Sequence, residues 1–319
     1  MVGARGRAGS LGAAPAKLRR ADGSRGNVGV MSDASEKSVG TGASGVMRES
    51  HSVASSDGTP IAFQTCGDKA ARPLLLLHGW AQSSRAWGDE LLGRLAGTFR
   101  VIAMDLRGHG NSGAPSAGYD DSRLWADDMA AVLDAEGVGD GAGAIVLGWS
   151  YGGIVVGDFV AAEGTSRIGG IVLCGATTSI SRAPGGAVGD AMLAAGKGSV
   201  DPNPKRAIAA LGSFGADMFA QQVGEGQQRL FGLSLATAPH VRGALLSRRV
   251  NNDEALAAAG VPALVIHGER DGIVLPSAGK ANAETLGVEC TVYPEVAHAP
   301  FLEAQDRFVA DLEAFAAGL

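Results

Sequence analysis

Residues 144–153 are Ala144-Ile145-Val146-Leu147-Gly148-Trp149-Ser150-Tyr151-Gly152-Gly153. The first four form an uninterrupted apolar run, which is typical of a strand buried on both faces of a sheet. A helical pattern at residues 154–162 follows, so the stretch predicts a strand, a sharp turn and a helix. Gly148 and Gly152 flank the turn, where a strained backbone and a close neighbouring chain require small residues. Ser150 stands at its apex.

Similar apolar runs bounded by turns recur on both sides of this segment. They lie at residues 74–77, 101–104, 168–173, 263–266 and 291–293. Helical patterns separate them, as at residues 122–138, and Asp57-Gly58 lies between two short strand-like runs as a hairpin turn would. This alternation predicts an α/β protein with a mostly parallel, doubly wound sheet that is covered by helices on both sides.

One long interval departs from the alternation. Residues 177–260 contain no strand run and show helix-like pieces around residues 211–219 and 230–248. We expect a helical cap, inserted before the penultimate strand of a core formed by residues 51–176 and 261–319. An insertion there lies over the carboxyl ends of the strands, where ligands bind in this architecture.

The N-terminal residues 1–50 have a different composition from the rest. They are rich in Gly, Ala, Ser and Arg without an apolar period, so we expect a disordered tail. A transit peptide and an upstream extension, with Met31 or Met47 as the true start, both remain open. The tail holds eight Lys/Arg and four Asp/Glu, which leaves a formal charge of −10 on the other residues. Nucleic acid is therefore not an expected partner.

The chain shows no signs of a membrane, disulfide or metal protein. It lacks the roughly 18 consecutive apolar residues of a spanning helix and the apolar core of a secretory signal, which predicts a cytoplasmic protein without membrane partners. Cys66, Cys174 and Cys290 are an odd number at wide spacing, so we expect reduced structural cysteines. The six histidines have no metal-ligand spacing, and we expect neither a metal nor another cofactor.

Ser150 is the candidate nucleophile because of its place between strand and helix, since Gly-x-Ser-x-Gly alone means little in a chain with 49 glycines. A serine hydroxyl needs a base to take its proton. His298 follows the last strand run in a loop that can reach over the sheet, and it is the candidate base. His267 ends a buried strand, which favours a packing role, and His109 is expected to fix a turn.

The base in turn needs a buried carboxylate that orients it. Asp271 follows the strand at residues 263–266 and precedes a turn, which places it at the carboxyl edge of the sheet beside the histidine loop. Glu269 is the alternative, although it lies closer to the strand end and is expected to point elsewhere. The chain order Ser150, Asp271, His298 is that of an α/β-hydrolase.

The negative oxygen that forms on attack needs two backbone donors. The N–H of Tyr151, directly after the nucleophile, is the first candidate. The N–H of Trp80 is the second, because His78-Gly79-Trp80 follows the strand at residues 74–77 and Gly79 permits the bend. The Trp80 ring is also expected to line the pocket. The alternative is that His78-Gly79 only ends the strand.

From about Val53 to the C-terminus, apart from the cap, the chain resembles the α/β-hydrolase superfamily. Three segments are also similar to the pimeloyl-ACP methyl ester esterases of biotin synthesis and their esterase neighbours: His78-Gly79-Trp80 with Trp87, Leu147-Gly148-Trp149-Ser150 with Gly152-Gly153, and Ala297-His298-Ala299-Pro300-Phe301. The resemblance implies a carboxylic ester hydrolase with Ser150 as nucleophile, His298 as base and Asp271 as its orienting acid. Tyr151 departs from the Leu expected after the nucleophile, and the cap is unfamiliar.

The expected substrate is a small-molecule ester of a small or medium acyl chain. The cap residues Phe214, Met218, Phe219 and Phe231 suggest an acyl pocket, although ordinary core packing explains them as well. An acyl carrier protein would dock on a basic patch such as Arg242, Arg248 and Arg249, for which a solvated helix surface is the favoured explanation.

Two other functions fit the same residues. A cofactor-free haloperoxidase or perhydrolase uses the same triad and forms peracids when peroxide replaces water. A small-molecule receptor on a hydrolase fold would keep the triad with negligible turnover. An epoxide hydrolase or haloalkane dehalogenase is disfavoured, because those enzymes carry Asp where this chain has Ser150.

Overall fold

A computed structural model of the protein describes residues 38–41, 47–180 and 187–319, so most of the predicted tail lies outside the described residues. Within these ranges, nine strands form one sheet in the order β1-β2-β3-β5-β4-β6-β7-β10-β11. The strands are β1 Ser38–Thr41, β2 Met47–Ala54, β3 Pro60–Cys66, β4 Pro73–Leu77, β5 Arg100–Met104, β6 Ala144–Trp149, β7 Ile168–Cys174, β10 Ala263–Gly268 and β11 Cys290–Tyr293.

The sheet is parallel from β5 to β11 and antiparallel from β1 to the β3–β5 pair. Each apolar run named from the sequence forms one of its strands, and all residues of β5 and β6 are buried. The Asp57-Gly58 turn joins the antiparallel strands β2 and β3, as predicted. Strand structure begins inside the predicted tail of residues 1–50, where β1 pairs with the start of β2, so the expectation of disorder up to residue 50 was wrong at that end. Neither segment has an apolar run that would have predicted a strand there.

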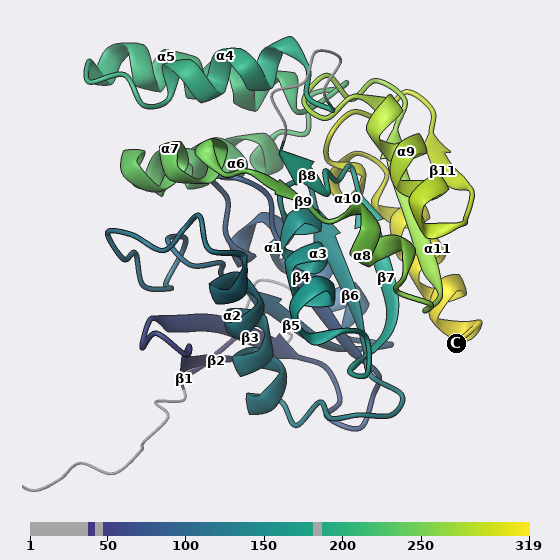
Figure 1. The fold of residues 1–319 in the computed structure, drawn as a ribbon. Helices are drawn as coiled ribbons and strands as arrows, with labels where there is room; N and C mark the ends of the chain where they lie inside the picture. The colour runs from purple at the N-terminus through teal and green to yellow at the C-terminus, as the bar shows by residue number, and fades with distance from the viewer. Residues whose placement is uncertain (1–37, 42–46, 181–186) are drawn as a thin grey trace, which may run out of the picture. The chain divides into compact units, whose positions relative to one another are not determined.

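Helices cover both faces of the sheet (Figure 1). One group of helices is a row in which each helix packs against the next, in the order α2, α3, α8, α9. The other group contains α1, which packs against α11. The core helices are α1 Gly88–Leu95, α2 Ser122–Ala135, α3 Gly152–Glu163, α8 Asp253–Ala257, α9 Pro276–Leu286, α10 Pro300–Glu303 and α11 Gln305–Ala317, and η1 Ser84–Trp87 is a 3₁₀ helix. The doubly wound α/β architecture predicted from the sequence is confirmed.

Five described helices lie between β7 and β10, and four of them form the cap: α4 Asp190–Gly198, α5 Pro204–Asp217, α6 Glu225–Ala236 and α7 Pro239–Ser247. The fifth, α8, falls inside the range predicted for the cap but packs with the core helices α3 and α9. Figure 1 shows α4 and α5 as one layer and α6 and α7 as a second, and α6 contacts η1 of the core. The expectation of an insertion without strands was wrong at its two ends. There β8 Ser179–Ile180 and β9 Val250–Asn251 pair antiparallel, and two residues are too few to produce a strand period.

No helix in the described part of the chain is long and apolar enough to cross a membrane. All three cysteines are free; Cys66 is buried and Cys290 is partly buried. Cys174 is buried in β7, as the sequence predicts.

Candidate active site

Ser150 lies at the junction of β6 and α3 with a left-handed backbone, φ 55°. For a residue with a side chain this conformation costs on the order of 1–3 kcal/mol and persists only where the surroundings enforce it. Three backbone hydrogen bonds do so here. The Ser150 N–H donates to the Cys174 carbonyl at 3.1 Å, and the Ser150 carbonyl accepts from the N–H groups of Gly153 at 3.0 Å and Thr177 at 3.2 Å.

The two glycines that flank the serine have no space for a side chain. A Cβ on Gly152 would lie 2.3 Å from the Leu77 carbonyl oxygen at the end of β4. A Cβ on Gly148 would lie 2.7 Å from the backbone of Gly152 and Gly153. The sharp turn between strand and helix therefore requires glycine at both positions, as the sequence predicts.

Asp271 and His298 form a buried pair at the carboxyl edge of the sheet, after β10 and β11 respectively. The Asp271 Oδ2 lies 2.8 Å from the His298 Nδ1. The other carboxylate oxygen accepts the N–H groups of Ile273 at 2.9 Å and Val274 at 3.0 Å. Burial alone would raise the pKa of Asp271, but His298 and the hydrogen bonds with His267 and His298 hold it at about 2. Asp271 is thus an oriented anion facing the imidazole.

His267 has a role that the sequence did not reveal. Its Nε2 lies 2.9 Å from the Val274 carbonyl and 3.3 Å from the Asp271 Oδ2, the same oxygen that faces His298, so it is a second imidazole beside this carboxylate. The sequence feature that could have predicted this contact is the spacing of four residues between His267, at the end of the strand, and Asp271, after it. Glu269 points elsewhere, as expected, since its Oε2 accepts the exposed Glu295 N–H at 3.2 Å.

The serine and the histidine loop are brought together by the residues on each side of them. The Trp149 Nε1 donates to the His298 carbonyl at 2.8 Å. A Cβ on Gly175, the residue after Cys174, would lie 3.3 Å from the Asp271 Oδ2 and 3.4 Å from the His298 Nδ1. The Ser150 Oγ makes no hydrogen bond to another described residue. Catalytic hydrogen bonds often tighten only once substrate is bound.

The histidine loop is attached to the cap as well as to the sheet. The His298 N–H donates to the Met218 carbonyl at 3.0 Å. The half-buried Glu303 carboxylate accepts the N–H of Ala297 at 2.9 Å and that of Ala220, in the cap, at 2.7 Å. The backbone of the candidate base is therefore bonded directly to the cap, and Ala297 is linked to the cap through Glu303.

Two backbone N–H groups, one on each of the two segments that meet at Ser150, are candidate donors for a negative oxygen. The N–H groups of Trp80 and Tyr151 donate to no acceptor among the described residues. The loop that carries Trp80 is in contact with the nucleophile, because a Cβ on Gly79 would lie 3.0 Å from the Ser150 Cβ. This arrangement suits a pair of donors for a negative oxygen.

The loop after β4 is held rigidly by His78. Its Nε2 accepts the Leu106 N–H at 3.0 Å, and its Nδ1 lies 2.8 Å from the Gly79 carbonyl. Burial lowers the pKa of His78 to about 4, so the ring is neutral at pH 7. The Trp80 ring packs edge-on against Phe214 of the cap at 5.3 Å, and its Nε1 donates to the Arg242 carbonyl at 3.0 Å.

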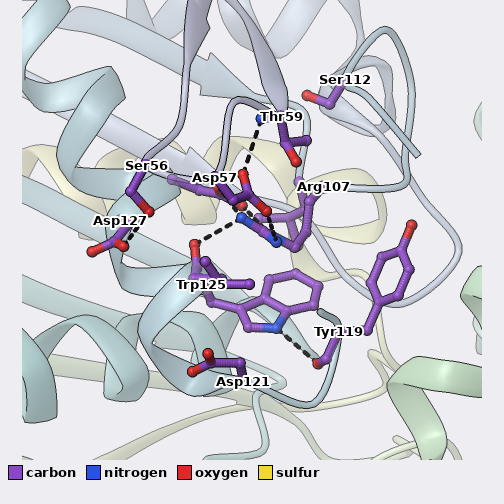
Figure 2. Close-up of polar contacts among 12 residues, drawn as sticks. Ser56, Asp57, Thr59, Arg107, Ser112, Tyr119, Asp121, Trp125 and Asp127 are labelled. Carbon is purple, nitrogen blue, oxygen red and sulfur yellow. Dashed lines mark hydrogen bonds and ion pairs between the residues drawn. The ribbon is translucent and has the colours of Figure 1, made fainter. Parts of the chain in front are cut away.

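The loop at residues 105–112 is structural. Figure 2 shows Asp57 and Arg107 in contact beside Trp125. The fully buried Arg107 donates to both oxygens of Asp128 at 2.6 Å and to Asp57 at 3.1 Å. His109 is a buried turn residue, as predicted, with its Nδ1 2.9 Å from the Arg107 carbonyl.

The candidate site is enclosed. Ser150 is 8% exposed, and Asp271 and His298 are more deeply buried. Within the described ranges, no three His, Cys, Asp or Glu side chains are grouped so that they could hold a metal ion.

Residues 74–312 match a family model described as the alpha/beta hydrolase family. The chain belongs to the alpha/beta hydrolase family. This hydrolase is 48% identical to the esterase RhEst1 from Rhodococcus sp. ECU1013, whose crystal structure matches with a TM-score of 0.80 over 84% of this chain and 98% of that chain.

Two curated relatives match this hydrolase over most of their length. It is 30% identical over 275 residues to a non-heme haloperoxidase from Rhodococcus erythropolis. The matched region covers 82% of this chain and 98% of that relative. It is 29% identical over 273 residues to a pimeloyl-[acyl-carrier protein] methyl ester esterase from Neisseria meningitidis, which covers 78% of this chain and 95% of the relative. The resemblance stated from the sequence motifs is confirmed.

Proposed function

We propose that this α/β hydrolase cleaves carboxylic esters of small or medium acyl chains, with Ser150 as nucleophile, His298 as base and Asp271 as the acid that orients the base. The observation that carries the proposal is the buried Asp271–His298 pair, 2.8 Å apart, beside a serine in a strained turn. The match to the esterase RhEst1 supports the ester class.

The mechanism uses an acyl-enzyme intermediate. The Ser150 Oγ attacks the ester carbonyl while the His298 Nε2 takes its proton, and Asp271 stabilises the resulting imidazolium. The N–H groups of Trp80 and Tyr151 donate to the negative oxygen. The C–O bond to the alcohol breaks as His298 returns the proton to the leaving oxygen. Water, deprotonated by His298, then attacks the acyl-enzyme carbonyl. The bond from the acyl carbon to the Ser150 Oγ breaks as His298 returns the proton to that oxygen, which releases the acid and restores the serine.

Buried apolar residues that adjoin Trp80 and His298 support an apolar acyl group. Trp80, Phe214 and Met218 are buried and come from the loop after β4 and from the cap. Phe231, which the sequence grouped with them, packs against Gly212 and Gly215 of α5 and belongs to the cap interior. We therefore expect the acyl chain to contact Trp80, Phe214 and Met218.

An acyl carrier protein as the carrier of the acyl group is a finer proposal, supported by the name of the Neisseria relative. The basic patch considered for its docking was a wrong prediction, as was the alternative of a solvated helix surface. Arg242 and Arg248 are buried, because both guanidinium groups donate to groups inside the protein. Of the three arginines, Arg249 alone is exposed.

Perhydrolysis is a second candidate reaction, favoured by the match to a haloperoxidase over 98% of that relative. Hydrogen peroxide in place of water would attack the same acyl-enzyme, giving a peracid and free Ser150. Peroxide-dependent bromination in acetate, compared with ester hydrolysis by the same preparation, separates the two activities.

The test is a chain-length series of p-nitrophenyl esters with the wild type, Ser150→Ala and the exposed control Ser247→Ala. We expect Ser150→Ala to lower kcat by roughly 10⁴ to 10⁶ and to abolish labelling by a fluorophosphonate probe, with the control unchanged. Wild-type turnover in Ser150→Ala would refute the assignment. A receptor would show negligible turnover in the wild type itself.

A further inference from the structure

Arg248, the residue that follows cap helix α7, is buried against the nucleophile turn. Its Nη1 donates to the Tyr151 hydroxyl at 3.0 Å, and its Nη2 donates to the Asp158 Oδ2 at 2.7 Å and to the Ser122 Oγ at 3.0 Å. Its guanidinium carbon lies 5.1 Å from the centre of the Trp125 ring. The end of the cap thus reaches the residue directly after the serine.

Arg248 is itself held firmly by helix α3. Arg248 and Asp158 form an ion pair whose two side chains are fully buried. Asn252 supports the pair, since its Nδ2 donates to the Asp158 Oδ1 at 3.2 Å and to the Ile154 carbonyl at 3.0 Å. A buried ion pair adds little stability compared with apolar side chains of the same size, and fixing the position of a neighbouring group is one use of such a pair.

The group that it places is Tyr151. The Tyr151 ring lies 5.7 Å from the Trp125 ring, and its hydroxyl accepts the hydrogen bond from Arg248, so the side chain is fixed along its length. The peptide between Ser150 and Tyr151 belongs to the strained turn and carries an N–H without a described acceptor. A side chain fixed at its tip limits rotation of that peptide.

We propose that Arg248 is a positioning residue of the oxyanion hole, holding Tyr151 from the cap so that the Tyr151 N–H faces the developing negative oxygen. The inference rests on the proposed function. It accounts for the tyrosine that stands where the resemblance expects leucine, because leucine has no group that could accept from Arg248. It also makes the cap a structural part of the catalytic centre.

The chain offers a matched control in Tyr119. Tyr119 and Tyr151 are equally buried, at 3% exposed, and both rings contact Trp125. The Tyr119 hydroxyl, in contrast, has no hydrogen-bond partner in the described part of the chain. Removal of each hydroxyl separates the effect of the Arg248 bond from that of a buried phenol.

The experiment compares wild type, Tyr151→Phe and Tyr119→Phe in p-nitrophenyl ester hydrolysis and in inhibition by a trifluoromethyl ketone. The Ser150 Oγ adds to the ketone carbon, which leaves a negative oxygen in the oxyanion hole. For Tyr151→Phe we expect kcat and kcat/KM to fall roughly tenfold at unchanged KM, and Ki to rise by the same factor. Tyr119→Phe should stay within about twofold of wild type.

A second pair of changes tests Arg248 without leaving a charge unpaired. Arg248→Met combined with Asp158→Leu removes both charges and should show the same loss as Tyr151→Phe, with no further loss when the three changes are combined. If Tyr151→Phe keeps kcat/KM within twofold of wild type, or changes KM alone, the positioning role is wrong while the esterase stands. Full activity of Ser150→Ala would instead overturn the proposed function and this role with it.

Discussion

Asp271 is the most constrained side chain of the candidate site. One carboxylate oxygen accepts two backbone N–H groups, and the other faces His298 at 2.8 Å and His267 at 3.3 Å. These four contacts fix the orientation of the carboxylate and therefore the position of the His298 ring that faces it. The Nδ1 proton of His298 must point to this carboxylate, which leaves the Nε2 free to accept a proton from the serine.

Asp271→Asn tests this orientation without a change of shape. The amide NH₂ would face the His298 Nδ1 and favour the tautomer with the proton on Nε2, which cannot act as a base. We expect kcat for p-nitrophenyl esters to fall by roughly 10⁴. Asp134→Asn, at a largely exposed ion pair with Arg167, is the control and should keep its activity. A loss below tenfold in Asp271→Asn would show that another group orients the base.

The candidate triad could be predicted because its members follow strand runs that are legible in the sequence. Ser150, Asp271 and His298 each come after an apolar run, and parallel strands bring their carboxyl ends to one edge. The support of Asp271 by His267 could not be predicted, since a histidine at a strand end is equally suited to packing. The burial of Arg242 and Arg248 was missed for a related reason. Arg242 donates to the Ser199 carbonyl, and Arg248 donates to Asp158, Ser122 and Tyr151, all of which are distant in the chain.

At the scale of elements, the cap is bonded to every loop of the candidate site. The loop after β4 donates to it through the Gln82 Nε2, which lies 2.8 Å from the Ser234 Oγ of α6. The histidine loop is held by the Met218 carbonyl, and the serine turn by Arg248. Three such attachments join the loops of the candidate site to the cap by hydrogen bonds.

Glu303→Gln tests the attachment of the histidine loop. The carboxylate accepts from Ala297 with one oxygen and from Ala220 with the other, so an amide would leave one N–H facing an NH₂ donor. We expect kcat to fall roughly tenfold. The amide can keep the hydrogen bond from Ala297, in the His298 loop, or the one from Ala220, in the cap, but not both. Glu313→Gln, which affects only an exposed bond with Thr98, should match wild type in the same assay. Equal activity of both variants would contradict the coupling.

The elements themselves could be predicted where side chains carried a period. The six parallel strands did so, whereas β1 has no apolar run and β8 and β9 have two residues each. These three strands are defined by backbone hydrogen bonds to a partner strand. The hydrophobic pattern of one segment does not reveal such pairing.

Across the whole molecule, two buried neutral histidines make stability depend on pH. His78 and His109 contact edge to face at 5.1 Å. Burial lowers the pKa of His78 to about 4, and burial followed by repulsion from His78 lowers that of His109 to about 3. In the unfolded chain both titrate near the ordinary value of about 6.5. Between these values the unfolded state binds more protons, so the free energy of unfolding falls as the pH drops below about 6.5.

Urea unfolding at pH 7, 6 and 5 measures this dependence. Each histidine contributes up to about 1.4 kcal/mol per pH unit to the slope. His109→Asn keeps a donor for the Arg107 carbonyl in place of the Nδ1 and removes one titrating group. Its stability should therefore decline from pH 6 to pH 5 less steeply than that of wild type, by about the contribution of one histidine. Identical slopes in the two proteins would mean that His109 accepts its proton without unfolding, and that the pair is not held neutral by the core.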